Sequence, residues 1–283
     1  MKVQFSKMHG LGNDYVYINC LHQKIKHPNE LSVFVSDRHF GIGSDGLVLI
    51  CPSDKADFEM RMFNADGSEG NMCGNAIRCV GKYVYDNRLT DQTDLEIDTK
   101  SGVKQLHLTI ENHRAVAAEV NMGEAVLRSR SIPVETDYDE FISQPMLVHG
   151  EVYLVTCVSM GNPHAVIFCD DVDSIPLEII GPLFENHEKF PERINTEFVQ
   201  LIDRSTLKMR VWERGSGETF ACGTGACASV VAAVINDHCD PGSEVTVRLK
   251  GGELKITYQE DHTVLMKGPA THVFDGTIDA PIA

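Results

Sequence analysis

Two short stretches of the chain, residues 71–79 (NMCGNAIRC) and residues 221–227 (ACGTGAC), determine how the rest of the sequence is interpreted. In each stretch, a Cys-Gly pair is followed directly by a run of apolar and small residues with helical spacing. Both stretches therefore predict a helix that is entered immediately after a cysteine, at Cys73 in the first and at Cys222 in the second.

The two Cys-Gly pairs lie 149 positions apart (222 − 73 = 149), and other short matches share this offset. The matching segments are Cys73-Gly74 and Cys222-Gly223, Gly12-Asn13 and Gly161-Asn162, Met60-Arg61 and Met209-Arg210, Asn87 and Asn236, and Gly102 and Gly251. Chance is a poor explanation for several separated segments that all match at the same offset, without a net insertion between them. A period of this length exceeds the roughly 20–50 residues of solenoid repeats, so the sequence predicts two similar domains.

The rest of the chain indicates the fold class. Apolar and polar residues alternate in segments 58–64 and 207–213, which is typical of half-buried strands. The sequence therefore predicts a mixed α/β fold of two pseudo-symmetric, duplicated domains. We place the N-terminal half at residues 1–119 and the C-terminal half at residues 120–268, and expect segment 269–283 to pack on the N-terminal half. Helices are expected near residues 29–37, 75–87, 177–186 and 224–237, and one extended segment over residues 263–279.

The composition argues against several classes of protein. The chain has 283 residues and a net charge of −16, which is unsuited to binding nucleic acid or an anionic membrane surface. No segment approaches the roughly 18 consecutive apolar residues that span a membrane, and no signal-peptide-like run is present, so we expect a cytoplasmic protein. The nine cysteines, none spaced Cys-x-x-Cys, fit reduced thiols better than disulfides or a structural zinc site.

Cys73 and Cys222 occupy positions that suit acid–base chemistry. A cysteine at a helix N-terminus lies beside unpaired backbone N–H groups and the positive end of the helix dipole. We expect this environment to lower the pKa of both thiols from about 8.5, and the same N–H groups can hold a carboxylate. A lone cysteine is more often a small buried apolar residue, which is our interpretation of Cys20, Cys51, Cys79, Cys157, Cys169, Cys227 and Cys239.

Two thiols that face each other suit the inversion of a carbon stereocentre. One proton must leave from one face of the carbon, and another must arrive on the opposite face. A thiolate on one side and a thiol on the other perform both transfers, and their roles exchange in the reverse direction. Two helix N-termini directed at the adjacent carboxylate would stabilise the transition state more than the ground state.

Longer motifs accompany these cysteines: residues 8–14 (MHGLGND), 64–68 (NADGS), 72–75 (MCGN), 161–164 (GNPH), 213–215 (ERG) and 221–226 (ACGTGA). In this order and spacing they resemble the motifs of the diaminopimelate epimerase family, over residues 3 to about 275. The resemblance implies that a curved strand layer surrounds a central helix in each domain, with the active site in the cleft between the domains. It also implies a homodimer that interconverts LL- and meso-2,6-diaminopimelate in lysine and peptidoglycan-precursor biosynthesis, without pyridoxal phosphate or metal.

The resemblance further implies roles for single residues. Cys73 and Cys222 would be the acid–base pair, and His164 would lie near the thiols and influence their protonation. The substrate would be bound by the side chains of Asn13, Asn64, Asn162, Asn195 and Arg214, its reacting amino group by Glu213, and its reacting carboxylate by backbone groups of Gly74, Asn75, Gly223 and Thr224. Some relatives carry Gln where this chain has Gly46, so that contact is absent here.

The same residues also allow simpler interpretations. Asn and Gly dominate turns for backbone reasons, so Gly12-Asn13 and Gly161-Asn162 are also typical of turns. Glu213-Arg214 is also compatible with a solvent-exposed ion pair, which contributes little to stability. The duplicated positions of the two Gly-Asn pairs, and the apolar strand that ends at Glu213, favour substrate contact.

Three rival functions remain open at this point. A proline or hydroxyproline racemase has a similar layout but typically carries His where this chain has Asn75. A thiol hydrolase would use one cysteine as a nucleophile with His164 as its base, which leaves the second cysteine without a role. A redox protein would instead close a Cys73–Cys222 disulfide.

Overall fold

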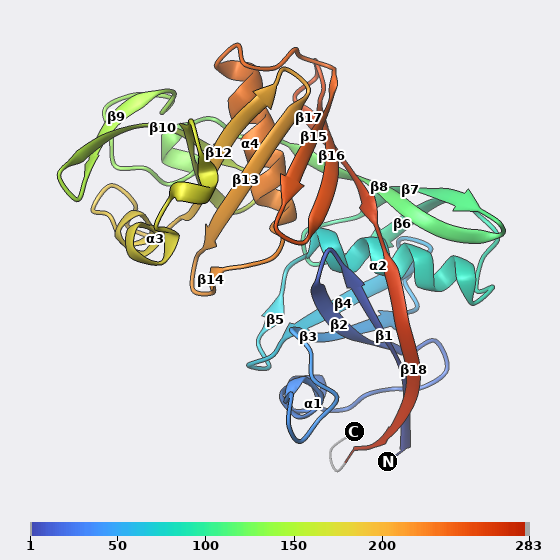
Figure 1. Ribbon diagram of the computed structural model, residues 1–283. Coiled ribbons are helices and arrows are strands. Elements are labelled where there is room, and N and C mark those ends of the chain that lie inside the picture. The colour runs from blue at the N-terminus through green and yellow to red at the C-terminus, as the bar shows by residue number, and fades with distance from the viewer. Residues whose placement is uncertain (1, 281–283) are drawn as a thin grey trace. The chain divides into compact units, whose positions relative to one another are not determined.

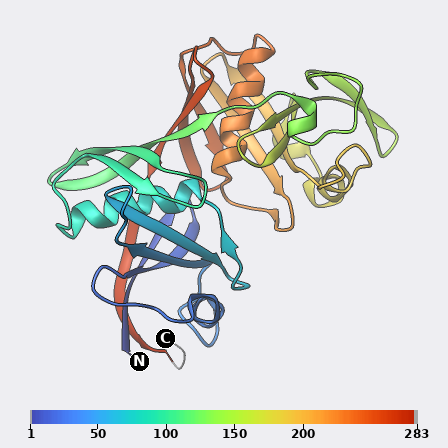
Figure 2. The ribbon, with the colours of Figure 1, turned by 180° about the vertical axis from the view of Figure 1, so that it is seen from behind.

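The computed structural model describes residues 2–280, and the chain divides into two compact units (Figures 1 and 2). Unit 1 comprises Met1–Asn121 together with Lys267–Ala283, and unit 2 comprises Met122–Met266. In the described part of the chain, no helix is long and apolar enough to cross a membrane.

Unit 1 is built on a mixed sheet. Its strands are β1 (Lys2–Gly10), β2 (Asn13–Asn19), β3 (Gly46–Cys51), β4 (Phe58–Asn64), β5 (Glu69–Gly70), β6 (Asp94–Asp98), β7 (Lys104–Glu111), β8 (Arg114–Glu124) and β18 (Thr271–Asp279). They pair in the order β18-β1-β2-β3-β4-β6-β7-β8, with β5 added on β4. The β2–β3 and β4–β6 pairs are parallel, so each needs a crossover connection.

Two helices supply those crossovers. Helix α1 (Pro28–Ser36) has proline at its first position, where the missing N–H costs nothing, and it packs Leu31 and Val35 on the sheet core. Helix α2 (Gly74–Asp86) begins after Cys73 and is buried along most of its length. A Cβ at Gly81 would lie 2.9 Å from a methyl of Leu108, so this glycine lets α2 approach β7 closely.

Unit 2 repeats this arrangement. Its strands are β9 (Gln144–Val148), β10 (Glu151–Ser159), β11 (Pro163–Cys169), β12 (Asn195–Asp203), β13 (Thr206–Glu213), β14 (Gly217–Glu218), β15 (Glu244–Leu249), β16 (Gly252–Tyr258) and β17 (Thr263–Pro269). The sheet order is β9-β10-β11-β12-β13-β15-β16, again with two parallel pairs, β11–β12 and β13–β15. Its helices are α3 (Leu177–Glu185), α4 (Gly223–Ile235) and the 3-10 turns Ser129–Ser131 and Val172–Ser174.

The two units agree closely along the chain. The bounds of α3 lie 149 positions after those of α1, and the bounds of α4 lie 149 positions after those of α2. The strand register agrees too, because Tyr15 pairs with Gly46 in unit 1 and His164 pairs with Asn195 in unit 2. The prediction of a mixed α/β fold with duplicated domains is confirmed.

Some predicted elements differ from the structure. Residues 263–279 were expected as one segment but form two strands, β17 and β18, separated at Ala270. Strand β18 pairs antiparallel with β1, so the end of the chain completes the sheet of unit 1 (Figure 1). Strands β8 and β9 were not predicted, because alanines in β8 and Pro145 in β9 weaken the signal of a strand.

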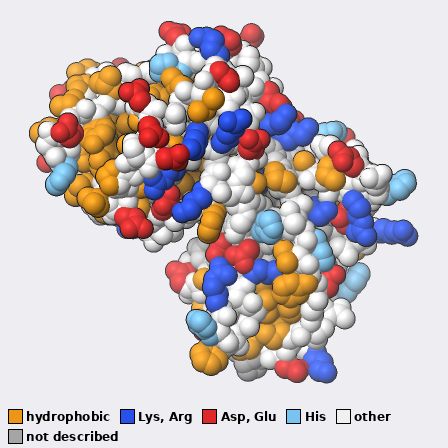
Figure 3. Space-filling model, in the orientation of Figure 1, with side chains coloured by type: hydrophobic (Ala, Val, Ile, Leu, Met, Phe, Trp, Pro, Cys, Tyr) orange, Lys and Arg blue, Asp and Glu red, His pale blue; other side chains and the backbone are white. Residues whose placement is uncertain are grey.

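The surface of unit 2 carries an apolar face over β9, β10 and α3 (Figure 3). The exposed side chains there are Leu147, Val152, Leu154, Ile179 and Leu183. Outward-facing residues of an antiparallel hairpin are usually polar, so β9 and β10 depart from the ordinary alternation.

Candidate active site

Cys73 lies at the N-cap of α2 in an extended conformation, with φ −135° and ψ 120°. Its carbonyl accepts the first helical hydrogen bond from the Ile77 N–H at 2.9 Å. Its thiol donates to Oδ1 of Asn13 at 3.5 Å, and Nδ2 of Asn75 donates to the same oxygen at 3.3 Å. Unit 1 thus brings together three residues that the sequence singled out.

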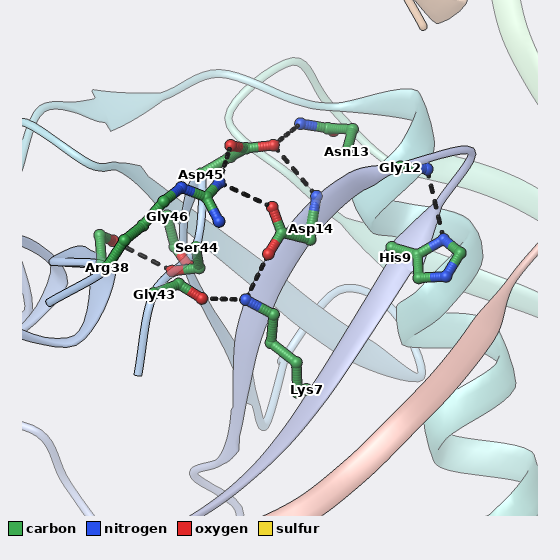
Figure 4. Close-up of polar contacts among 11 residues, drawn as sticks. Lys7, His9, Gly12, Asn13, Asp14, Arg38, Gly43, Ser44, Asp45 and Gly46 are labelled. Atoms are coloured by element: carbon green, nitrogen blue, oxygen red, sulfur yellow. Dashed lines mark hydrogen bonds and ion pairs between the residues drawn. The ribbon is translucent and has the colours of Figure 1, made fainter. Parts of the chain in front are cut away.

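The orientation of the Asn13 amide is set by a carboxylate. Nδ2 of Asn13 donates to Asp45 at 2.9 Å, and Asp45 also accepts from the Asp14 N–H and from Arg38 (Figure 4). Because an ionised carboxylate only accepts hydrogen bonds, the amide nitrogen must face Asp45 and the amide oxygen must face Cys73.

The same network holds Asp14 in its charged form. Lys7 forms an ion pair with one of its oxygens, and Arg38 bonds the other at 3.1 Å (Figure 4). Burial raises the pKa of Asp14, but the bonds from Lys7 and Arg38 more than offset this, so its pKa lies below the ordinary value. The start of β2 is therefore anchored by charged groups directly beside Asn13.

The fully buried Arg78 fixes the first turn of α2. Its guanidinium donates to the Gly74 carbonyl at 2.9 Å, to Oδ1 of Asn75 at 2.9 Å and to the Pro269 carbonyl at 3.2 Å. Sequence reasoning missed this residue, although an arginine inside an apolar helical run was a usable signal.

Cys222 occupies the equivalent N-cap of α4 and is buried. Its sulfur accepts from the Gly225 N–H at 3.3 Å and lies 3.5 Å from Oγ1 of Thr224. Nδ2 of Asn162 donates to the same Thr224 oxygen at 3.3 Å, so the Asn13–Asn75 contact of unit 1 has a counterpart here in which the helix residue is the acceptor.

The expectation of a lowered pKa is wrong for Cys222. Burial raises the pKa of this thiol well above its ordinary value, and the charges of Glu213 and Glu197 raise it further. Bonds from Thr224 and the Gly225 N–H lower the pKa but do not offset the rise. Cys222 is therefore a neutral thiol near neutral pH, which is the form that can deliver a proton.

A buried pair of hydrogen-bonded side chains, His164 and Glu197, lies next to Cys222. Nδ1 of His164 is 2.7 Å from Oε1 of Glu197, and both side chains are completely buried. Nε2 of His164 is 3.1 Å from Oδ1 of Asn162, so the histidine reaches the thiol through Asn162 and Thr224. Sequence reasoning missed Glu197, an acidic residue within an inward-facing apolar strand.

Glu213 contributes a second carboxyl group beside Cys222. It accepts a hydrogen bond from the Thr219 hydroxyl, and its charge acts on the Cys222 thiol. Burial raises the pKa of Glu213 above its ordinary value, and the charge of Glu197 adds to the rise. The two carboxyl groups and the thiol are therefore electrostatically coupled.

The remaining predicted residues are placed as follows. Nδ2 of Asn64 bonds Oγ of Ser68 at 2.9 Å on the surface. Asn195 is buried, and its amide donates to the Pro163 carbonyl at 2.7 Å and accepts from the Arg214 N–H at 2.9 Å. The guanidinium of Arg214 donates to the Glu192 carbonyl at 3.0 Å. Asn195 thus ties the start of β11 to the turn that carries Arg214.

Within residues 2–280, no group of three or more His, Cys, Asp or Glu side chains is arranged to hold a metal ion.

Comparisons with known proteins show the family to which the chain is similar. The family model for diaminopimelate epimerase matches residues 5–128 and 156–273. The chain is 58% identical to the diaminopimelate epimerase of Methanococcus maripaludis strain S2 over 278 residues, covering 98% of this chain and 100% of that protein. It is 55% identical to the enzyme of Acetivibrio thermocellus, covering 98% and 99% of the two chains.

Solved structures share the fold at low sequence identity. A PhzF-family phenazine biosynthesis protein from Bacillus anthracis superimposes with a TM-score of 0.73 at 12% identity, covering 99% of this chain and 100% of that chain. A hydroxyproline epimerase from Agrobacterium vitis gives a TM-score of 0.69 at 11% identity, covering 98% and 91%. These similarities support the fold alone. The sequence matches over nearly the whole length show that the chain belongs to the diaminopimelate epimerase family and is an isomerase of the epimerase class.

Proposed function

We propose that this enzyme interconverts LL- and meso-2,6-diaminopimelate, with Cys73 and Cys222 as a paired acid and base. The proposal is supported by family membership and, above all, by one repeated arrangement. In each unit a helix begins directly after a cysteine, and a 3.3 Å bond joins the residue two positions after that cysteine to an asparagine, Asn13 in unit 1 and the equivalent Asn162 in unit 2. The equivalence predicts two chemically matched groups that can exchange roles.

The protonation of Cys222 suggests how the cycle begins. A raised pKa favours Cys222 as the proton donor, and Cys73 would then be the base that removes the α-proton of the substrate. The Cys222 thiol then protonates the opposite face of the same carbon. After one turnover the two cysteines have exchanged forms, and the meso isomer is the substrate for the reverse reaction.

The helix starts would bind the reacting carboxylate. Backbone N–H groups of Gly74, Asn75, Gly223 and Thr224 belong to the first turns of α2 and α4, where the positive end of the helix dipole favours an anion. As the α-proton leaves, negative charge moves onto the carboxylate. These donors would therefore stabilise the transition state more than the ground state.

Other predicted residues would orient the rest of the substrate. Arg214 suits the distal carboxylate because a guanidinium can bind it through two hydrogen bonds. The Glu213 carboxyl group would contact the reacting amino group, and His164 would influence Cys222 through Asn162. The distal amino group and carboxylate would also contact Asn13, Asn64 and the amide of Asn195.

The proposal extends to the cellular setting. The enzyme would act in lysine and peptidoglycan-precursor biosynthesis as a cytoplasmic homodimer, with a small molecule as its substrate and no cofactor. It would bind no nucleic acid, in line with the net charge of −16.

The direct test is turnover of LL-diaminopimelate by the purified enzyme, with the isomers separated by chiral chromatography. We expect the meso isomer to form, and Cys73→Ala and Cys222→Ala each to lower kcat by about a thousand-fold or more. Cys169→Ala is the matched control, because Cys169 is a partly exposed thiol at the end of β11, and it should keep full activity. Turnover of proline or hydroxyproline in place of diaminopimelate would instead support the racemase alternative.

A further inference from the structure

Tyr15 lies in the middle of β2 on the face that meets helix α2. Residues two apart on a strand share a face, so Asn13, Tyr15 and Tyr17 project together. The hydroxyl of Tyr17 donates to the Ala76 carbonyl of α2 at 3.3 Å, and Asn13 contacts Cys73. Tyr15, only 5% exposed, therefore stands between two residues that both reach the start of the helix.

The side chain of Tyr15 lies beside Asn13, and it is close enough to Cys73 for the charge of a Cys73 thiolate to act on its hydroxyl. Burial raises the pKa of Tyr15 well above its ordinary value, and the charges of Cys73 and Asp45 raise it further. The phenol is therefore neutral throughout the range in which a cysteine ionises. A neutral phenol donates its proton in a hydrogen bond, and a thiolate is a better acceptor than a thiol.

Gly46 provides the space for this ring. Tyr15 and Gly46 are neighbours in the parallel β2–β3 register. A Cβ at position 46 would lie 2.8 Å from Cε1 of Tyr15 and 2.1 Å from the Phe63 carbonyl oxygen. Any side chain at position 46 would thus displace the tyrosine or the strand, which explains in physical terms why glycine occupies this position.

The duplication places Tyr15 at the position equivalent to His164. The register pairs Tyr15–Gly46 and His164–Asn195 lie 149 positions apart at both residues. Nε2 of His164 lies 3.1 Å from Oδ1 of Asn162, and Tyr15 follows the equivalent Asn13 by two positions on the same face of β2. Each unit therefore places a side chain that carries a proton beside the asparagine associated with its cysteine.

We propose that Tyr15 is a positioning residue that stabilises the thiolate form of Cys73 through its hydroxyl, and that Gly46 makes this contact possible. The inference rests on the proposed role of Cys73 as a base. It adds a residue of unit 1 whose hydroxyl would favour the thiolate of Cys73, whereas at Cys222 burial and the charges of Glu213 and Glu197 outweigh the bonds from Thr224 and the Gly225 N–H. The two thiols would then differ in protonation at rest, as a cycle that starts from one isomer requires.

The test is Tyr15→Phe, which removes one oxygen atom and keeps the ring. We expect the Cys73 thiolate to become harder to form, so that alkylation of Cys73 by iodoacetamide near pH 7 slows by about five- to ten-fold. The rate is measured on the tryptic peptide 62–78, in which Cys73 is the only cysteine. The acid limb of the pH profile of kcat/KM should move to higher pH by about 0.7–1 unit, which corresponds to the same five- to ten-fold change. KM should change little.

Tyr17→Phe is the matched control, because it removes a buried hydroxyl from the same face of β2 that contacts Ala76 and Cys79. It should leave the Cys73 profile unchanged. Superimposable profiles for Tyr15→Phe and the wild type, or equal shifts in both variants, would overturn the proposal. The alkylation profile needs no substrate, so it stays informative if diaminopimelate is not turned over, an outcome that would refute the proposed function instead.

Discussion

Replacing Glu197 by Gln should lower the pKa of Cys222. A Cβ built at Gly225 would be 2.6 Å from Oε1 of Glu197 and 3.2 Å from the Cys222 sulfur. The carboxylate oxygen and the sulfur are therefore at most about 5.8 Å apart. At an effective dielectric constant of about 20, two unit charges at this distance interact by about 3 kcal/mol, or about 2 pKa units. His164, 2.7 Å from the same oxygen, offsets part of this effect, so we expect a fall of about 1–2 units.

The titration can be followed through thiolate absorbance near 240 nm, as the difference between Glu197→Gln and the double variant Glu197→Gln/Cys222→Ser. The difference in absorbance between the wild type and Cys222→Ser gives the titration curve of Cys222 in the presence of Glu197, which serves as the reference. Glu185→Gln is the matched control, since Glu185 is a buried carboxylate of the same unit that instead bonds Trp212 and Arg193. A Cys222 pKa that is unchanged or higher in Glu197→Gln would refute the electrostatic reasoning.

Further predictions concern stability and the acid network. Arg78→Ala should lower the free energy of unfolding by about 3 kcal/mol, because its bonds to Gly74, Asn75 and Pro269 are lost, and an unchanged midpoint of urea denaturation would contradict this. Asp14→Asn should cost about 1 kcal/mol at neutral pH. Because the folded pKa of Asp14 is lowered, the wild type's advantage is present above the unfolded pKa of about 3.9 and is lost as pH falls through the folded value. Unfolding curves of both proteins from pH 2.5 to 7 check this, and a constant difference would argue against it. Glu213→Gln has the opposite sign, because the raised pKa makes the wild type lose stability as pH rises through the folded value. The variant should gain relative to the wild type on going from pH 4 to pH 8, and a relative loss in the same unfolding series would rule this out.

The helices and the duplication could be predicted from the sequence because their signals are local. The Cys-Gly pairs before apolar runs predicted α2 and α4 to within about two residues, and the common offset predicted the second unit from the first. Strand β8 was missed because alanine has little preference for strands, and β8 contains three alanines.

The electrostatics of the site could not be predicted, because they depend on residues far apart in the chain. The helix-dipole argument for Cys222 included only its own helix. Strands β12 and β13 bring Glu197 and Glu213 next to the thiol, and their charges together with burial reverse the direction of the pKa shift. Arg78 is a similar case, since one of its acceptors, the Pro269 carbonyl, lies 191 positions away.

Tyr15 was missed for a different reason. An aromatic residue in a strand is normally interpreted as part of the core, and Tyr15 does pack there. Only the register with Gly46 and the position of Cys73 point to the proposed role of its hydroxyl at the thiol. A buried tyrosine has to place its hydroxyl near a partner, and this requirement is the one sequence-level signal that could have identified it.

The central claim is that two different groups act on opposite faces of one carbon. It is tested most directly by following LL-diaminopimelate in deuterated water at early times, with mass and chirality resolved. We predict that each meso molecule carries one deuterium at the inverted α-carbon while the remaining LL substrate is unlabelled. Substrate and product labelled to the same extent from the start, or meso product without deuterium, would indicate a single base and contradict the account.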